Sequence, residues 1–166
     1  MKNNKTYHLA AAAVLAVLTF IFTAYLGHFP IGQGGYIHFG DSIIYLAASL
    51  LPAPFSFFCV FGAVLADVSA AAHIWIVPTI IVKTAIVILF SSKGDKILTK
   101  KNLIMSAVAG VVGIVGYYIA EGIIYGNFLA PMVSVPFGLI QAGGSMIFYV
   151  LIAYFMDRAK FKDYIK

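Results

Sequence analysis

Four ionisable side chains lie within, or at the ends of, stretches of sequence that are otherwise apolar: Asp41, Asp67, Lys83 and Glu121. A charge in the middle of a lipid bilayer costs about 2.5–3.5 kcal/mol on insertion scales, so such residues usually face a protein interior and serve a function. Simpler roles stay open for three of them. Asp41 could cap a helix, and Asp67 and Lys83 could form a buried structural pair instead of contacting a ligand. Glu121 has no evident partner in the sequence, which favours a ligand contact.

A glycine-rich stretch over 34–41 (GGYIHFGD) leads into Asp41. Three glycines so close together let the backbone turn sharply and approach a ligand. Within this stretch Tyr36 offers a flat face for stacking and His38 offers a polar ring. We therefore expect a loop over 28–40 that covers a binding site.

Aromatic residues accompany Glu121 at helical spacing. Tyr117, Tyr118 and Tyr125 share one helix face with it, which suits a flat, hydrogen-bonding ligand. Alternatives remain, because tyrosine and tryptophan also anchor helices at membrane interfaces and a lone amide can join two helices. The candidate binding residues are Tyr36, His38, Asp41, Asp67, Trp75, Lys83, Tyr118, Glu121 and Gln141.

Catalytic and metal-binding patterns find little support in the sequence. The histidines do not have a metal-ligand spacing, and the serines lack a recognisable nucleophile pattern. A phosphate-binding loop of the ATPase type does not occur, and the single cysteine, Cys59, excludes a disulfide within the chain. The sequence therefore predicts neither an enzyme nor a cofactor.

The composition indicates a membrane protein. Of the 166 residues, 62% are hydrophobic and 10% are charged, whereas soluble domains have roughly 45–50% and 25%. Long apolar runs favour spanning helices over a barrel, whose strands would alternate. The net charge of +5 comes from lysines grouped at the ends of these runs, which fits membrane orientation and not nucleic-acid binding.

We predict an all-α, six-transmembrane-helix bundle that forms a single integral membrane domain over 1–166. The second segment is short and ends at Pro52, so a re-entrant segment is the alternative there. The predicted spans are 9–27, 41–51, 55–71, 75–90, 103–125 and 132–156.

The positive charges predict the orientation. With six spans, ten of the eleven lysine and arginine residues fall on one side, which should be the cytoplasm and should hold both termini. The loops 28–40, 72–74 and 126–131 on the other side contain no lysine or arginine. The acids would then lie in the outer half, in a pocket open to the outside. Ala12 and Ala16, one turn apart, predict a close helix contact, either with a partner protein or within the chain.

The motifs together resemble a known family, the substrate-binding S components of energy-coupling factor (ECF) vitamin transporters, and more closely their riboflavin-type group. The resemblance covers most of the chain and depends on residues 35–48 (GYIHFGDSIIYLAA), on Asp67 leading to Trp75 and Lys83, on Tyr118 with Glu121, and on 135–137 with Gln141. It implies a six-helix protein of the cell membrane that captures a vitamin from outside. The implied partners are an EcfT-like transmembrane coupling subunit, which the Ala12–Ala16 face would meet, and two cytoplasmic ATPase subunits.

Among vitamins, we favour a pyrimidine or pyridine compound, such as hydroxymethylpyrimidine or pyridoxine, over riboflavin. Two other functions compete with this prediction. A self-sufficient small carrier or channel would use Lys83 and the acids as an ion path, and a membrane enzyme acting on lipids would need paired acids at the cytoplasmic face.

Overall fold

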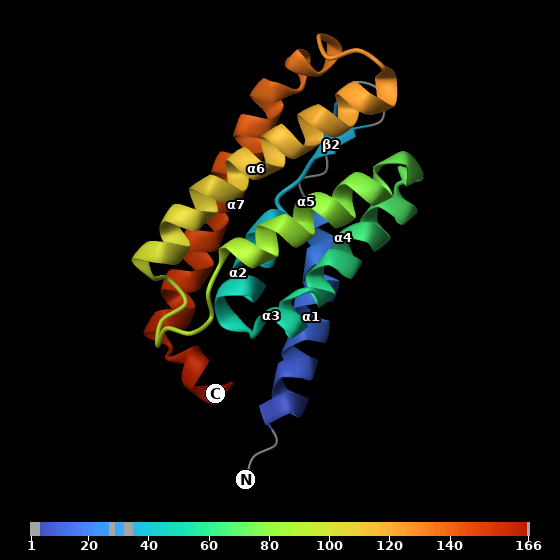
Figure 1. The fold of residues 1–166 in the computed structure, drawn as a ribbon. Coiled ribbons are helices and arrows are strands. Elements are labelled where there is room, and N and C mark those ends of the chain that lie inside the picture. The colour runs from blue at the N-terminus through green and yellow to red at the C-terminus, as the bar shows by residue number, and fades with distance from the viewer. Residues whose placement is uncertain (1–3, 27–28, 32–34, 166) are drawn as a thin grey trace.

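In the part of the chain that the structure describes, apolar runs form six helical segments that pack side by side along a common direction (Figure 1). The computed structural model describes residues 4–26, 29–31 and 35–165. The helices are α1 (Asn4–Ala24), α2 (Asp41–Leu50), α3 (Ala53–Ser56), α4 (Phe58–Ser69), α5 (Ile76–Leu89), α6 (Lys100–Tyr125) and α7 (Val135–Arg158). Short 3-10 turns η1 (His73–Trp75), η2 (Ala130–Val133) and η3 (Phe161–Tyr164) complete the helical structure.

The predicted six-helix architecture is confirmed. The third segment is divided, because Pro52 starts the single turn α3 and the chain bends at Phe57 before α4 begins. The first helix begins at Asn4, five residues earlier than predicted. By length and composition, α1, α6 and α7 can each cross a bilayer, while the helices over Asp41–Leu50, Ala53–Ser69 and His73–Leu89 are shorter apolar segments.

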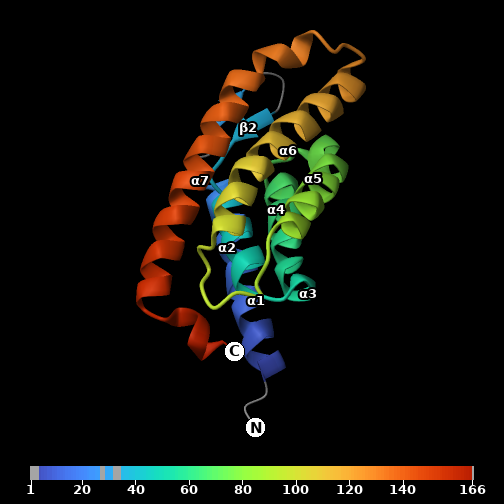
Figure 2. The same ribbon diagram turned by 60° about the vertical axis from the view of Figure 1, so that its left-hand side comes forward.

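The short helix α2 is the centre of the bundle. All ten of its residues are buried, and it packs against α1, α4, α5 and α7 (Figures 1 and 2). Ten residues span about 15 Å, roughly half a hydrocarbon core. A helix of this length cannot cross the bilayer by itself, and its neighbours α1, α4, α5 and α7 enclose it.

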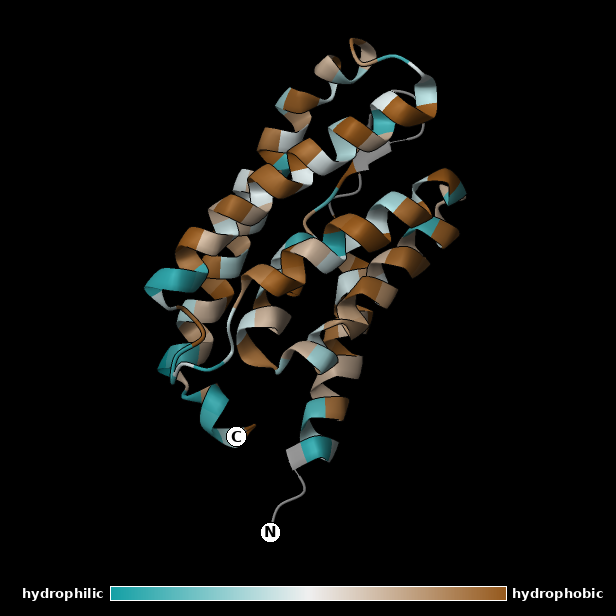
Figure 3. Cartoon of the chain, in the orientation of Figure 1, coloured by the Kyte–Doolittle hydropathy of each residue, from teal (hydrophilic) through white to brown (hydrophobic). Residues whose placement is uncertain are grey.

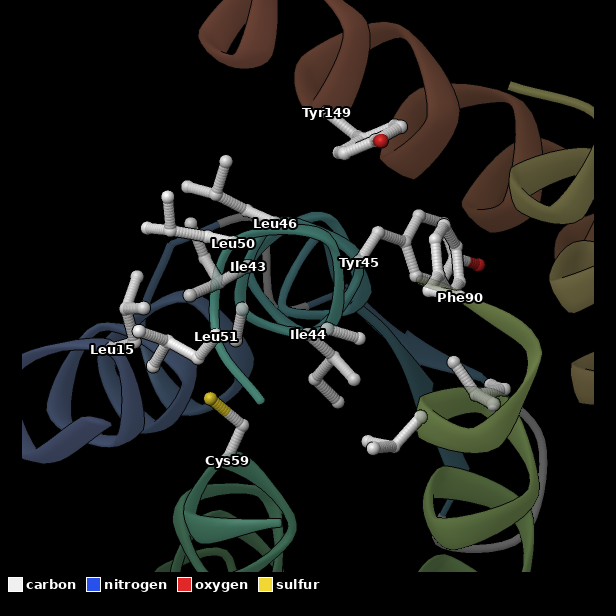
Figure 4. Packing of buried hydrophobic residues seen from close by; sticks show 14 of the residues in the cluster. Leu15, Ile43, Ile44, Tyr45, Leu46, Leu50, Leu51, Cys59, Phe90 and Tyr149 are labelled. Atoms are coloured by element: carbon white, nitrogen blue, oxygen red, sulfur yellow. The ribbon is translucent and has the colours of Figure 1, made fainter. Parts of the chain in front are cut away.

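Aromatic and aliphatic side chains of α2 make the core (Figure 4). The ring of Tyr45 stacks on Phe90 with centroids 5.1 Å apart, and meets Tyr149 edge-on at 5.9 Å. On its other side α2 packs against Leu15 of α1 and Cys59 of α4. The core therefore fixes α2 between two groups of helices.

Small residues let α1 and α4 approach each other closely. Ala12 is completely buried, and an added Cβ on Gly62 would collide with the carbonyl oxygen of Ala16. The backbones of the two helices thus approach each other closely within this chain. Ala12 and Ala16 therefore take part in an internal helix contact, which was one of the two alternatives. A docking role for this part of α1 stays a prediction.

The two ends of the bundle differ in charge. The hairpin end carries β1 (Phe29–Ile31) and β2 (Gly35–Ile37), an antiparallel pair with Phe29 opposite Ile37, and the connection from α6 to α7. The cation-rich end carries both termini and the segment 90–99, and polar residues gather there in Figure 3. The sequence predicted only a loop over 28–40, because strands of three residues give too little alternation to be recognised.

Candidate functional site

A cavity of about 130 Å³ lies in the hairpin half of the bundle and is called the pocket below. Side chains from α1, α2, α4, α5, α6 and α7 line it, together with residues from β2, η1 and η2. The structure brings together at this pocket eight of the nine residues predicted from the sequence: His38, Asp41, Asp67, Trp75, Lys83, Tyr118, Glu121 and Gln141. The ninth, Tyr36, has its backbone in β2, and its side chain lies outside the described part of the chain.

An ion pair between Lys83 and Asp41 forms one wall of the pocket. Lys83 Nζ lies 2.6 Å from Asp41 Oδ1, and the two side chains are 1% and 6% exposed. This arrangement corrects two alternatives. The salt bridge of Lys83 is with Asp41, whereas the sequence suggested Asp67 as its partner. Asp41 does not cap α2, since Gly40 is the N-cap residue and no side chain caps the helix.

Gln141 of α7 extends this ion pair towards the hairpin. Its Nε2 donates to Asp41 Oδ2 at 3.1 Å, and its Oε1 accepts from the backbone N–H of His38 at 3.2 Å. The sequence predicted that Gln141 contacts either another helix or the ligand. In the structure its side-chain amide connects α7 to α2 and to His38, which follows β2. Because both ends of the amide are used, its orientation is fixed.

The segment between β2 and α2 is held by local hydrogen bonds. His38 Nδ1 accepts from the backbone N–H of Gly40 at 3.0 Å, and Ser42 Oγ donates to the carbonyl oxygen of Phe39 at 2.7 Å. Gly40 has no space for a side chain, because an added Cβ would collide with Thr23 Oγ1 on α1. The glycine therefore permits the close passage that places His38 and Asp41 on the pocket.

Aromatic rings form a second wall. Trp75 and Tyr117 lie with ring centroids 6.1 Å apart, and Lys83 Nζ lies 5.0 Å from the centroid of Tyr117. The hydroxyl of Tyr117 is 3.1 Å from Thr79 Oγ1. Tyr117 and Thr79 were not among the nine candidates, although Tyr117 lies four residues before Glu121 and shares its helix face.

Glu121 lies on α6 as Tyr117 does, one turn closer to the hairpin end of the bundle. Ser134 Oγ donates to Glu121 Oε1 at 3.2 Å, which gives this acid the partner that the sequence did not reveal. Neighbouring Tyr118 donates its hydroxyl to the carbonyl oxygen of Phe128 at 2.5 Å. Tyr118 therefore also helps to hold the connection between α6 and α7 in place, besides lining the pocket.

Two glycines of α6 serve different purposes. An added Cβ on Gly110 would lie 2.8 Å from the Cβ of Ala142, so this glycine permits close packing of α6 on α7. Gly113 also lines the pocket, but an added Cβ there would meet nothing within 4 Å. The empty space of the pocket therefore extends to the backbone of Gly113.

This arrangement is suited to binding a small solute. Charged, amide and hydroxyl groups line one cavity together with aromatic and apolar side chains. Sites that bind small molecules usually have such a lining. Within the described residues, no group of three or more histidine, cysteine, aspartate or glutamate side chains is placed to hold a metal ion.

Comparison with known proteins agrees with this description. A solved structure described as "Native-SAD phasing for ThiT from Listeria monocytogenes serovar" is similar in fold, with a TM-score of 0.58 and 15% sequence identity over 91% of each chain. No curated protein matches the sequence significantly. The family described as "ECF-type riboflavin transporter, S component" matches residues 3–158, nearly the whole chain. The protein is therefore a member of the family of ECF-type riboflavin transporter S components.

Proposed function

We propose that this S component captures a small heterocyclic vitamin, or a vitamin precursor, in the pocket beneath the hairpin. The observation that carries the proposal is the convergence of Asp41, Lys83, Gln141, Glu121 and the aromatic wall on one cavity. Ionisable groups are expensive inside a membrane protein, and a bound polar solute gives them a function.

The size of the cavity favours a compact ligand. A cavity of about 130 Å³ is close in size to one of roughly 150 Å³ that holds a single benzene ring. A substituted pyrimidine or pyridine, such as hydroxymethylpyrimidine or pyridoxine, is of this size, whereas the three fused rings and sugar-like chain of riboflavin are much larger. The single-ring compounds are therefore the preferred candidates for this chain.

The proposed direction of transport follows from the charges. The cation-rich end would face the cytoplasm and the pocket would open to the outside, so that the ligand is captured there. Family membership supports delivery through an EcfT-like coupling subunit driven by two ATPase subunits. The sequence has no phosphate-binding loop of its own, which is consistent with this dependence.

Filling the pocket tests the proposal directly. In Gly113→Leu the new side chain would occupy the cavity, and its Cβ would meet no other atoms. Leucine also has a higher helix propensity than glycine, so α6 should stay intact. We expect a loss of ligand affinity of about 100-fold, or about 2.7 kcal/mol, with unchanged thermal stability. The matched control is Gly143→Leu on α7, which is exposed, lies outside the pocket lining and also has nothing within 4 Å of an added Cβ.

The measurement begins with the purified protein. Compounds that copurify are identified by mass spectrometry, and their affinities for both variants are measured by titration calorimetry. Equal affinities for Gly113→Leu and Gly143→Leu would place the ligand elsewhere. Accumulation of the compound in vesicles that contain only this chain would favour the self-sufficient carrier instead.

A further inference from the structure

The cation-rich end of the bundle carries a surplus of positive charge on its surface. The segments 93–101 and 157–165 contain seven lysine or arginine residues and three aspartates. Asp157 accepts hydrogen bonds from the backbone N–H groups of Ile97 and Leu98, so the two segments lie against each other and share one surface. Six of the cations are exposed and are called the basic surface below: Lys93, Lys96, Lys100, Lys101, Arg158 and Lys160.

The fold itself makes little use of these exposed charges. The cation that holds this end together is the buried Lys162, which donates to the carbonyl oxygens of Ser49 and Lys96. Lys100 and Lys101 lie in the first turn of α6, which contains no acid. Positive charge is unfavourable at this end of a helix, so the two lysines do not stabilise α6. A negatively charged partner outside the chain would give them a function.

Exposed aromatic side chains lie beside the basic surface. Lys160 has a left-handed backbone (φ 52°) and turns the chain from the end of α7 into η3. Within the tail Lys162 and Ile165 are buried, whereas Phe161 and Tyr164 are exposed, Tyr164 to 73%. The tail is therefore fastened on one side and presents two large rings on the other.

The adjoining surface of α7 indicates which partner meets these groups. Helix α7 is long and apolar enough to cross a bilayer, and Leu151, Tyr154 and Phe155 near its end are exposed. Aromatic rings favour the level of the lipid headgroups, and lysine and arginine beside a spanning helix attract anionic lipids. An acidic soluble protein would match the charges, but it would not lie beside an apolar face that continues into the membrane.

We infer that the basic surface binds the phosphate-containing headgroups of anionic phospholipids in the leaflet at the cation-rich end, with Phe161 and Tyr164 at the level of these headgroups. The inference goes beyond the pocket, because none of these residues line it. Its failure would leave the proposed function intact.

Lipids that differ only in their headgroups test the inference. The purified protein in detergent is titrated with dioleoyl phosphatidylglycerol, which is anionic, or dioleoyl phosphatidylcholine, which has no net charge, and binding is measured by native mass spectrometry. We expect phosphatidylglycerol to bind at least about 10-fold more tightly. Glycerol 3-phosphate, an anion without acyl chains, should neither bind nor compete. Equal affinities for the two lipids would overturn the inference, and so would glycerol 3-phosphate binding as tightly as phosphatidylglycerol.

Charge variants then locate the preference. Replacing three cations together, Lys100→Gln, Lys101→Gln and Lys160→Gln, should lower the preference for phosphatidylglycerol by about 10-fold. The matched control carries arginine at the same three positions, which keeps the charge and should keep the preference. Asp163→Asn removes an exposed acid from η3 and should raise the affinity for phosphatidylglycerol a few-fold. Thermal unfolding checks that each variant is folded, and an unchanged preference in the glutamine variant or in Asp163→Asn would overturn the inference.

Cross-linking distinguishes a lipid from a protein partner. Benzoylphenylalanine in place of the exposed Tyr164 is photoactivated in membranes of cells that make the chain together with its coupling subunits. We expect phospholipid adducts, identified by mass spectrometry after digestion. Adducts with another protein at this position would overturn the inference and assign the surface to protein docking.

Discussion

The two ends of the bundle both bury polar side chains, but they use them differently. At the cation-rich end, Asp157 accepts hydrogen bonds from the backbone N–H groups of Ile97 and Leu98 at 2.7 and 2.9 Å. At the hairpin end, Asp41 and Lys83 bond to side chains and border a cavity. Polar groups that bind backbone hold the chain together, whereas polar groups around a cavity can bind a solute.

Further contacts at the cation-rich end follow the same pattern. Lys162 is 4% exposed and donates to the carbonyl oxygens of Ser49 and Lys96, at 3.2 and 3.3 Å. Asn102 Nδ2 donates to the carbonyl oxygens of Ser91 and Ile97, at 2.9 Å each. These side chains fasten the segment 90–99 and η3 to the bundle, so their first role is structural.

Helix α2 connects the two regions. Asp41 is its first residue and belongs to the pocket, while Ser49, near its other end, bonds through Oγ to the hydroxyl of Tyr149 at 2.9 Å. The same buried helix thus supplies the pocket with a charge and the cation-rich end with an anchoring point. Substitutions at the two ends should therefore separate binding from stability.

The largest effect on stability is expected from breaking the buried ion pair. Lys83→Met leaves the Asp41 carboxylate without its counter-ion, which should reduce the free energy of unfolding by about 3–5 kcal/mol. The double variant Lys83→Met with Asp41→Asn removes both charges and should recover part of this loss. Thermal unfolding in detergent provides the measurement, and a double variant less stable than Lys83→Met would contradict the assignment of the pair.

A smaller loss is expected at the opposite end. Asp157→Ala removes the acceptor of two backbone N–H groups, so the free energy of unfolding should fall by about 2–3 kcal/mol. Ligand affinity of the folded fraction should stay the same, since Asp157 is not part of the pocket lining. Asp163→Ala, an exposed acid on the same end, should change stability by less than about 0.5 kcal/mol. A large loss of affinity in Asp157→Ala would mean that the two ends are coupled.

The smallest effects come from deleting one hydroxyl group at each end. Tyr149→Phe loses the bond to Ser49 and should reduce stability by about 1 kcal/mol without affecting ligand affinity. Tyr117→Phe loses the bond to Thr79 inside the pocket, so ligand affinity should fall several-fold, by about 1 kcal/mol. Calorimetric titration and thermal unfolding of both variants test this contrast, which would disappear if both substitutions changed only stability.

Much of the architecture could be predicted from the sequence, because a lipid bilayer allows few kinds of backbone structure to cross it. Apolar runs over most of the chain had to become helices, and prolines such as Pro52 had to end them, so the six-helix prediction is confirmed. Eight of the nine candidate residues also meet at one pocket, and the ionisable ones do so because a charge in an apolar run must face inward. Whether each of them contacts the ligand stays a prediction.

Partner choice was the part that the sequence left open. The sequence suggested Asp67 as a structural partner for Lys83, whereas the packing of α2 against α5 brings Asp41 to it. Ala12 and Ala16 predicted a close contact without identifying the partner helix, which proved to be α4. Periodicity reports which side of a helix is small or polar, but not which neighbour it meets.

From its residues alone this chain had to be a helical membrane protein with costly polar groups turned inward, because the hydrophobic effect and backbone hydrogen bonding act on local sequence. Tertiary structure alone decided that Lys83 is neutralised by Asp41, that Glu121 meets Ser134, and that space remains beside Gly113. Those outcomes depend on distances between segments far apart in the chain, which are set by how the helices pack around α2.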